Sequence, residues 1–91
     1  MNKRFYESRA FTSTEKIYTL YFEKFFDAIT LESGLSGRFL SDGEIGAIFG
    51  VSVRQVRQIM RGLREKKVLY REWTGELRWF ENFEREYKPG K

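Results

Sequence analysis

The fold is decided by residues 40–72, which read LSDGEIGAIFGVSVRQVRQIMRGLREKKVLYRE. Ser41 and Glu44 have the spacing of a capping box, which predicts a helix of about two turns that begins there and runs through Phe49. Gly50 can adopt the left-handed conformation in which a helix ends sharply. This spacing therefore predicts a short helix followed at once by a tight turn.

A second helix is predicted from about Val53 to Lys67, with Ser52 as its N-cap. Its apolar side chains recur with the 3.6-residue period of one helix face: Val56, Ile59, Met60 and Leu63. The opposite face carries cationic and amide side chains: Arg54, Arg57, Gln58 and Arg61. The helix is therefore expected to anchor itself through one face and to expose a basic one.

The positive charge of the chain is concentrated in this helix. Residues 51–70 hold six Lys or Arg and one Glu, whereas residues 1–50 hold six against seven acids and residues 71–91 hold five against five. The net charge of +4 thus comes from one short segment. Such a patch is typical of a surface that binds nucleic acid or another polyanion, the alternative being a merely solvated helix face.

Extended segments follow the basic helix. Residues 68–73 and 76–80 favour β-strands, and Thr74–Gly75 has the pattern of a two-residue hairpin turn. We therefore expect a mainly α fold with a small β-hairpin and a three-helix core. The domain is expected over residues 12–80, with an N-terminal arm at 1–11 and a charged C-terminal tail at 81–91.

Composition excludes several classes of function. The chain has no Cys and no His, which removes thiolate nucleophiles, imidazole bases and nearly every ordinary zinc or copper site. We expect that the protein is not an enzyme and that it binds no metal ion and no cofactor. The first eleven residues lack the apolar run of a signal peptide, and no apolar run approaches the roughly 18 residues of a membrane span. We therefore expect a soluble protein of the cytoplasm, associated with the nucleoid or, if viral, in the host cytoplasm.

Seven positions in this stretch agree with the requirements of a helix-turn-helix. They supply apolar anchors, a small residue where the helices cross, and a glycine turn with an apolar plug: Ile45, Gly46, Phe49, Gly50, Val51, Val56 and Ile59. The segment resembles winged helix-turn-helix regulators of the GntR and MarR kind, and the helix-turn-helix domains of phage and plasmid replication or regulatory proteins. The likeness covers about residues 12–80. Lys67 departs from it, because that family usually has Gly there.

The resemblance implies a sequence-specific protein that binds double-stranded DNA, acts as a transcriptional regulator and reads the major groove with helix 53–67. Base-reading roles fall on Ser52, Val53, Arg54, Gln55, Arg57, Gln58 and Arg61. Roles in phosphate contact or in the hairpin, which would be the wing, fall on Ser41, Gly43, Arg64, Lys66, Lys67, Arg71, Thr74, Gly75 and Arg78. For the wing, the alternative is that Trp73, Leu77 and Trp79 simply close the core.

The helix that follows the capping box at Thr12 and Glu15 is apolar over most of its circumference. Such a helix lies either deep in a core or against a second subunit. Dimerisation is slightly favoured, because so many aromatics exceed what one small core can hold; the expected homodimer interface comprises Tyr18, Phe22, Phe25 and Phe26. The main alternative to DNA binding is a winged-helix protein–protein adaptor, or an accessory protein of phage or plasmid replication or partition.

Overall fold

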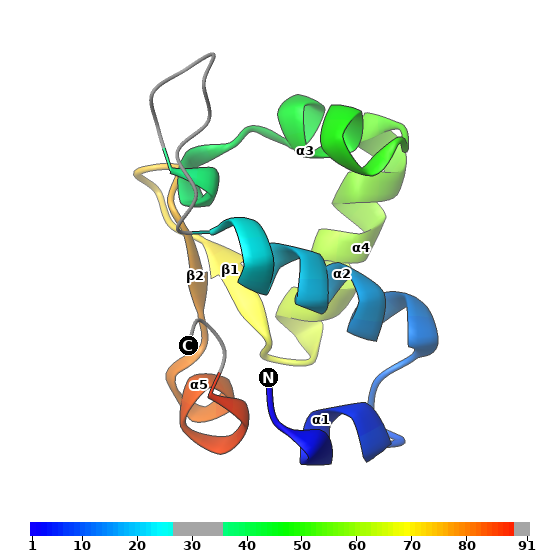
Figure 1. Ribbon diagram of the computed structural model, residues 1–91. Coiled ribbons are helices and arrows are strands. Elements are labelled where there is room, and N and C mark those ends of the chain that lie inside the picture. The colour runs from blue at the N-terminus through cyan, green and yellow to red at the C-terminus, as the bar shows by residue number, and fades with distance from the viewer. Residues whose placement is uncertain (27–35, 89–91) are drawn as a thin grey trace.

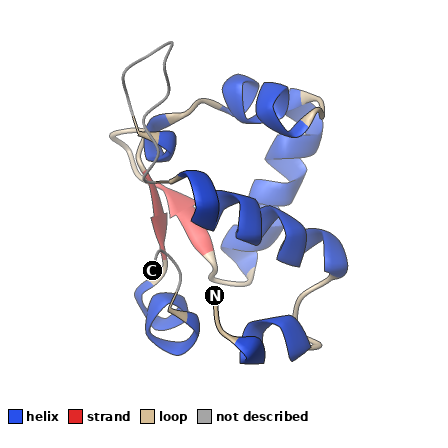
Figure 2. Cartoon of the chain, viewed as in Figure 1, coloured by secondary structure: helices blue, strands red, loops and turns tan. Residues whose placement is uncertain are grey.

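The computed structural model describes residues 1–26 and 36–88 of the chain (Figure 1). Over these residues the protein is mainly helical, with one antiparallel pair of strands (Figure 2), as the sequence predicts. The elements are α1 (Lys3–Glu7), α2 (Ser13–Phe25), the short 3-10 helix η1 (Gly37–Phe39), α3 (Asp42–Phe49), α4 (Val53–Glu65), β1 (Leu69–Arg71), β2 (Leu77–Trp79) and α5 (Glu81–Tyr87). In Figure 1, α3 lies at one end of the molecule and α1 and α5 lie at the other.

Two of the helices begin at the capping boxes that the sequence predicts. At the start of α2, Glu15 N–H donates to Thr12 Oγ1 at 3.1 Å, and Thr12 N–H donates back to the Glu15 carboxylate at 2.8 Å. Ser41 and Glu44 make the same reciprocal pair at the start of α3, at 3.2 and 3.0 Å. A cap of this kind contributes about 1 kcal/mol, so local sequence alone fixes where these helices start.

The turn between α3 and α4 depends on two glycines. Gly50 has φ +73°, the left-handed conformation that a side chain disfavours, and Val51 N–H donates to Gly46 O at 2.9 Å. Gly46 is buried where the turn crosses α3, and a Cβ there would lie 2.7 Å from Val51 O. Because both positions need a bare backbone, these two glycines determine how closely α3 and α4 approach.

The end of α4 contains a left-handed residue that is not glycine. Lys67 has φ +58°. Its N–H donates to Arg64 O at 3.0 Å, and Val68 N–H donates to Leu63 O at 2.8 Å, which together form a Schellman motif. Leu63 and Val68 are both fully buried. The helix thus ends two residues before the predicted Lys67, and the apolar contact between Leu63 and Val68 holds Lys67 in the conformation that Gly would adopt freely.

The β1–β2 hairpin has a longer turn than the sequence predicts. Leu69 pairs with Trp79, and Arg71 pairs with Leu77. Glu72 N–H then donates to Glu76 O at 2.8 Å, which leaves three residues at the tip, Trp73–Gly75, instead of the predicted two. Gly75 has φ +94°, as a three-residue hairpin with a left-handed glycine requires. The strands are accordingly shorter than expected.

The core is rich in aromatic rings and absorbs two residues that the sequence assigned to a subunit interface. Phe22 is 1% exposed and Phe26 is fully buried. The ring of Phe26 lies 5.0 Å from that of Trp79, and the ring of Phe22 lies 5.5 Å from that of Phe49. The expectation that these two phenylalanines face a second subunit is therefore wrong. The hairpin and the terminal helices enlarge the core beyond what three helices provide.

The first and last helices pack against each other. Phe5 of α1 is fully buried, with its ring 5.6 Å from Phe83 and 5.5 Å from Tyr87 of α5. Asn2 N–H donates to Tyr87 O at 3.3 Å, and Arg4 pairs with Glu86 at 2.9 Å. The segments expected as a flanking arm and tail thus contribute to the core. Residues 89–91 of that tail lie outside the described residues.

Candidate nucleic-acid interface

Helix α4 separates an apolar face from a basic one. Val56 and Leu63 are buried, while Ile59 and Met60 are partly buried against the core. The residues predicted to read bases are all exposed, in agreement with the helix periodicity: Ser52, Val53, Arg54, Gln55, Arg57, Gln58 and Arg61. Except for Ser52, the N-cap, these residues belong to α4 itself. The exposed face is therefore a strip of side chains on one helix, most of which can donate hydrogen bonds.

Two residues of this strip are used by the helix cap. Gln55 N–H donates to Ser52 Oγ at 3.2 Å, and Ser52 N–H donates to Gln55 Oε1 at 3.1 Å. The sequence predicted Ser52 as the N-cap of this third capping box, but not the return contact from Gln55. Because the two side-chain oxygens are engaged with backbone, Gln55 keeps its NH₂ group for an external acceptor, and Ser52 is mainly a helix-starting residue.

Arg71, on β1, is held by the fold. Its Nη1 donates to Leu40 O at 2.9 Å and to Gly75 O at 2.8 Å, and its Nη2 contacts Asp42 Oδ1 at 3.0 Å. These bonds tie the hairpin to the start of α3. Arg71 was predicted as a phosphate or wing contact, but the structure engages both of its terminal nitrogens internally.

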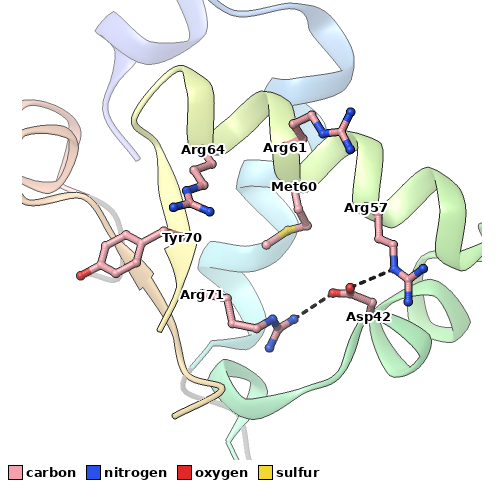
Figure 3. Close-up of a pocket in the computed structure, with 7 residues that line it drawn as sticks. All are labelled: Asp42, Arg57, Met60, Arg61, Arg64, Tyr70 and Arg71. Atoms are coloured by element: carbon pink, nitrogen blue, oxygen red, sulfur yellow. Dashed lines mark hydrogen bonds and ion pairs between the residues drawn. The ribbon is translucent and has the colours of Figure 1, made fainter. Parts of the chain in front are cut away.

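The carboxylate of Asp42 faces a second arginine. Its Oδ2 lies 3.6 Å from Nε of Arg57, so that Asp42 stands between an arginine of α4 and one of β1 (Figure 3). Asp42 is half-buried, whereas the Arg57 side chain is 71% exposed. Asp42 was not among the predicted site residues. Its place in the first turn of α3 indicated only a helix-starting role, because both partners are distant in sequence.

Two other cations predicted to contact phosphate are paired with acids. Lys66 Nζ lies 2.6 Å from Glu15 Oε1, and Arg78 Nη1 lies 2.9 Å from Glu72 Oε1. Hydrogen bonding and charge from Glu72 raise the pKa of Arg78. Partial burial raises the pKa of Glu15, but hydrogen bonds from Lys66 and from Thr12 outweigh it, so the pKa lies below its ordinary value of 4.5. Both cations are thus already neutralised in part.

The remaining cations of α4 and its end are free to meet an external anion. Within residues 1–26 and 36–88, no carboxylate pairs with Arg54, Arg61, Arg64 or Lys67, and all four side chains are exposed. Like charges held this close on one helix repel each other, and an anionic ligand relieves that repulsion.

A groove of about 280 Å³ runs between α4 and β1 (Figure 3). Its lining is dominated by arginines, with one acid: Asp42, Arg57, Met60, Arg61, Arg64, Tyr70 and Arg71.

Ser41 and Gly43, which the sequence predicted near phosphate, are exposed at the start of α3. Hydrogen bonds from the backbone and hydroxyl of Ser41 lower the pKa of Glu44, so a negative charge sits beside these two residues.

The hairpin tip presents one large side chain, Trp73, which the sequence placed among three residues that could close the core. Trp73 is 96% exposed, whereas Leu77 and Trp79 are buried. Core closure therefore applies to the latter two only. Thr74 Oγ1 donates to Glu72 at 3.4 Å, which uses the hydroxyl within the turn. Trp73 lies at the tip because the turn is one residue longer than predicted, and core closure is therefore wrong for this residue.

No protein-family model matches this chain, and no curated protein or solved structure matches it significantly. In the described part of the chain, no helix is long and apolar enough to cross a membrane. The same residues contain no cluster of acids able to hold a metal ion. The interpretation of the basic surface therefore depends on its geometry and charge.

Proposed function

We propose that this chain is a winged helix-turn-helix protein that binds double-stranded DNA and acts as a transcriptional regulator. The observation that carries the proposal is the exposed basic face of α4, which holds Arg54, Arg57, Gln58 and Arg61 clear of the core. A B-DNA major groove is about 12 Å wide and admits one α-helix. Arginine can donate two hydrogen bonds to guanine, and glutamine can pair with adenine.

The junction of α3 and α4 supports a helix-turn-helix. Gly46 gives the close approach, Gly50 the left-handed turn, and Val51 packs as a plug against the core. In such a motif the second helix lies in the DNA major groove while the first helix crosses the DNA backbone. The order of three helices followed by a hairpin agrees with a winged arrangement, in which β1 and β2 form a short wing.

The cations divide between base contact and phosphate contact. Arg54, Arg57 and Arg61 lie on the exposed face of α4, where they would meet base edges, while Arg64 and Lys67 lie toward its end, where they would meet phosphates. Each of the three other cations pairs with an acid of the same chain and is proposed to stabilise the fold: Lys66, Arg71 and Arg78. Phosphate contacts set the orientation on the duplex and base contacts set the sequence.

The direct experiment is selection of bound duplexes from a random pool, followed by titration of the selected site at several salt concentrations. Phosphate neutralisation predicts that affinity falls linearly on a log–log plot against salt. A recovered motif with that dependence supports the proposal. Salt-independent binding or no enrichment contradicts it and favours the protein–protein adaptor. A selected motif that matches an origin or partition locus would indicate the accessory role.

We further propose that the protein binds as a homodimer, through a surface that differs in part from the one predicted, since Tyr18 and Phe25 of the predicted interface are only partly buried. Phe22 and Phe26 are buried, but Ile17, Tyr21 and Ile48 are 51%, 43% and 55% exposed on α2 and α3. A two-fold contact there would pair two recognition helices, and such interfaces are the commonest in oligomers. Light scattering of the wild type and of Ile48→Lys tests this: a wild-type mass of 10.9 kDa without DNA, together with a complex of one chain per duplex with DNA, contradicts it.

A further inference from the structure

We infer that Asp42 is a positioning residue that orients Arg57 and thereby makes it the principal determinant of base preference; this inference rests on the proposed DNA binding. Asp42 lies in the first turn of α3 and does not belong to the reading helix. It reaches the base-reading strip only through its carboxylate, which lies between two arginines.

The carboxylate is held in place from the hairpin side. Its Oδ1 contacts Arg71 Nη2 at 3.0 Å, and Arg71 is itself fixed by the carbonyls of Leu40 and Gly75. The arginine that holds the carboxylate is therefore itself anchored by two backbone carbonyls. A charge held this way costs little further conformational entropy when it interacts with another group.

The second oxygen meets Arg57 at its Nε edge. The Oδ2–Nε distance of 3.6 Å makes Nε the closest approach of this arginine to the acid. The two terminal nitrogens stay available, and these are the pair that donates to O6 and N7 of guanine. The ion pair thus restrains Arg57 through its Nε, while most of its side chain remains accessible.

The other arginines of the strip have no such support. Among the described residues no acid pairs with Arg54 or Arg61, so each must lose its side-chain freedom when DNA binds. Arg57 has that freedom restricted in advance. The preference for guanine is therefore expected to be sharpest at the base pair that Arg57 contacts.

The negative charge of Asp42 has an opposite effect on overall affinity. This charge repels phosphate. Its removal therefore strengthens non-specific DNA binding, but weakens the discrimination between bases at the base pair that Arg57 contacts. A residue that served only to hold the fold would reduce binding to every sequence alike. This difference in sign separates a positioning role from a structural one.

The experiment compares wild type, Asp42→Asn, Arg57→Ala and the double variant on the selected duplex and on a set of single-base-pair changes. Asparagine keeps an oxygen for Arg71, and preference is a ratio of affinities measured on one preparation, so partial unfolding does not affect it. Glu72→Gln is the control, because it removes the acid that pairs with Arg78, elsewhere on the hairpin.

We expect Asp42→Asn to lower the preference about three- to tenfold, within the coupling range of contacting residues, at the base pair where Arg57→Ala also acts. No additional loss is expected in the double variant, and Glu72→Gln leaves the preference intact. Unchanged preference in Asp42→Asn, or an equal loss at all base pairs, overturns the inference although DNA binding stands. If the wild type shows no preferred duplex, the proposed function fails, and the inference with it.

Discussion

Lys66 Nζ at the end of α4 lies 2.6 Å from Oε1 of Glu15 at the start of α2, across 51 residues of sequence. The same carboxylate oxygen accepts from Thr12 N–H at 2.8 Å. One acid therefore completes the cap of α2 and ties the basic helix to it. The contact connects the element that carries the proposed site to the helix that contributes Phe22 to the core.

This contact makes stability dependent on pH. The pKa of Glu15 is lower in the folded chain than its ordinary value of 4.5, so its contribution to the free energy of unfolding is complete above that pH. The contribution is lost as pH falls below about 4.5 through the folded pKa. Urea unfolding of wild type and Glu15→Gln between pH 3 and 7 measures it. The difference in free energy of unfolding between the two proteins should shrink on acidification. A difference that stays constant with pH would exclude this role for the Glu15 charge.

Gly46 and Gly43, both in α3, predict opposite effects of the same substitution. Gly46→Ala places a Cβ 2.7 Å from Val51 O, and the displaced turn should cost about 1–3 kcal/mol. Gly43→Ala meets nothing closer than Ser41 Oγ at 3.8 Å and should gain up to about 1 kcal/mol from helix propensity. Thermal unfolding of the two variants compares them directly. Equal melting temperatures would contradict the close approach at Gly46.

Lys67→Gly should stabilise the protein. A left-handed residue with a side chain costs about 1–2 kcal/mol, part of which returns as the greater unfolded-state entropy of glycine, so the net gain is about 0.5 kcal/mol. For a chain of this size the melting temperature should rise by about 2–4 °C. Lys67→Ala is the matched control, since it removes the same charge but keeps the Cβ. A similar rise in the control would attribute the gain to charge instead of backbone conformation.

Arg64 and Arg71 line the same groove but should behave differently when truncated. Arg64 has no acidic partner among the described residues, so Arg64→Ala should weaken DNA binding for all sequences and reduce the salt slope by about 1. Arg71→Ala removes the donor to Asp42 Oδ1 and to two carbonyls, and should cost about 2 kcal/mol of stability. Paired melting and salt-titration series separate the two. A loss of stability in Arg64→Ala, together with a loss of DNA binding alone in Arg71→Ala, would refute the assignment of Arg64 to DNA and of Arg71 to the fold.

The local features of the fold were determined by the sequence because each depends on neighbouring residues. The hydroxyls of Thr12 and Ser41 reach amides three residues away, and Gly50 needs only its own backbone freedom. The two faces of α4 likewise follow from the helix period, which is why the exposed strip with Arg57 could be predicted.

Tertiary structure alone decided which cations remain available and where the aromatics lie. Arg71 meets Asp42 across 29 residues and Leu40 across 31, and no pattern of spacing indicates such partners. Phe26 is buried because Trp79 packs on its ring, although its own helix favoured an interface. Helix periodicity specifies the direction in which a side chain points, whereas the identity of the group that meets it depends on segments that the fold brings together from elsewhere in the chain.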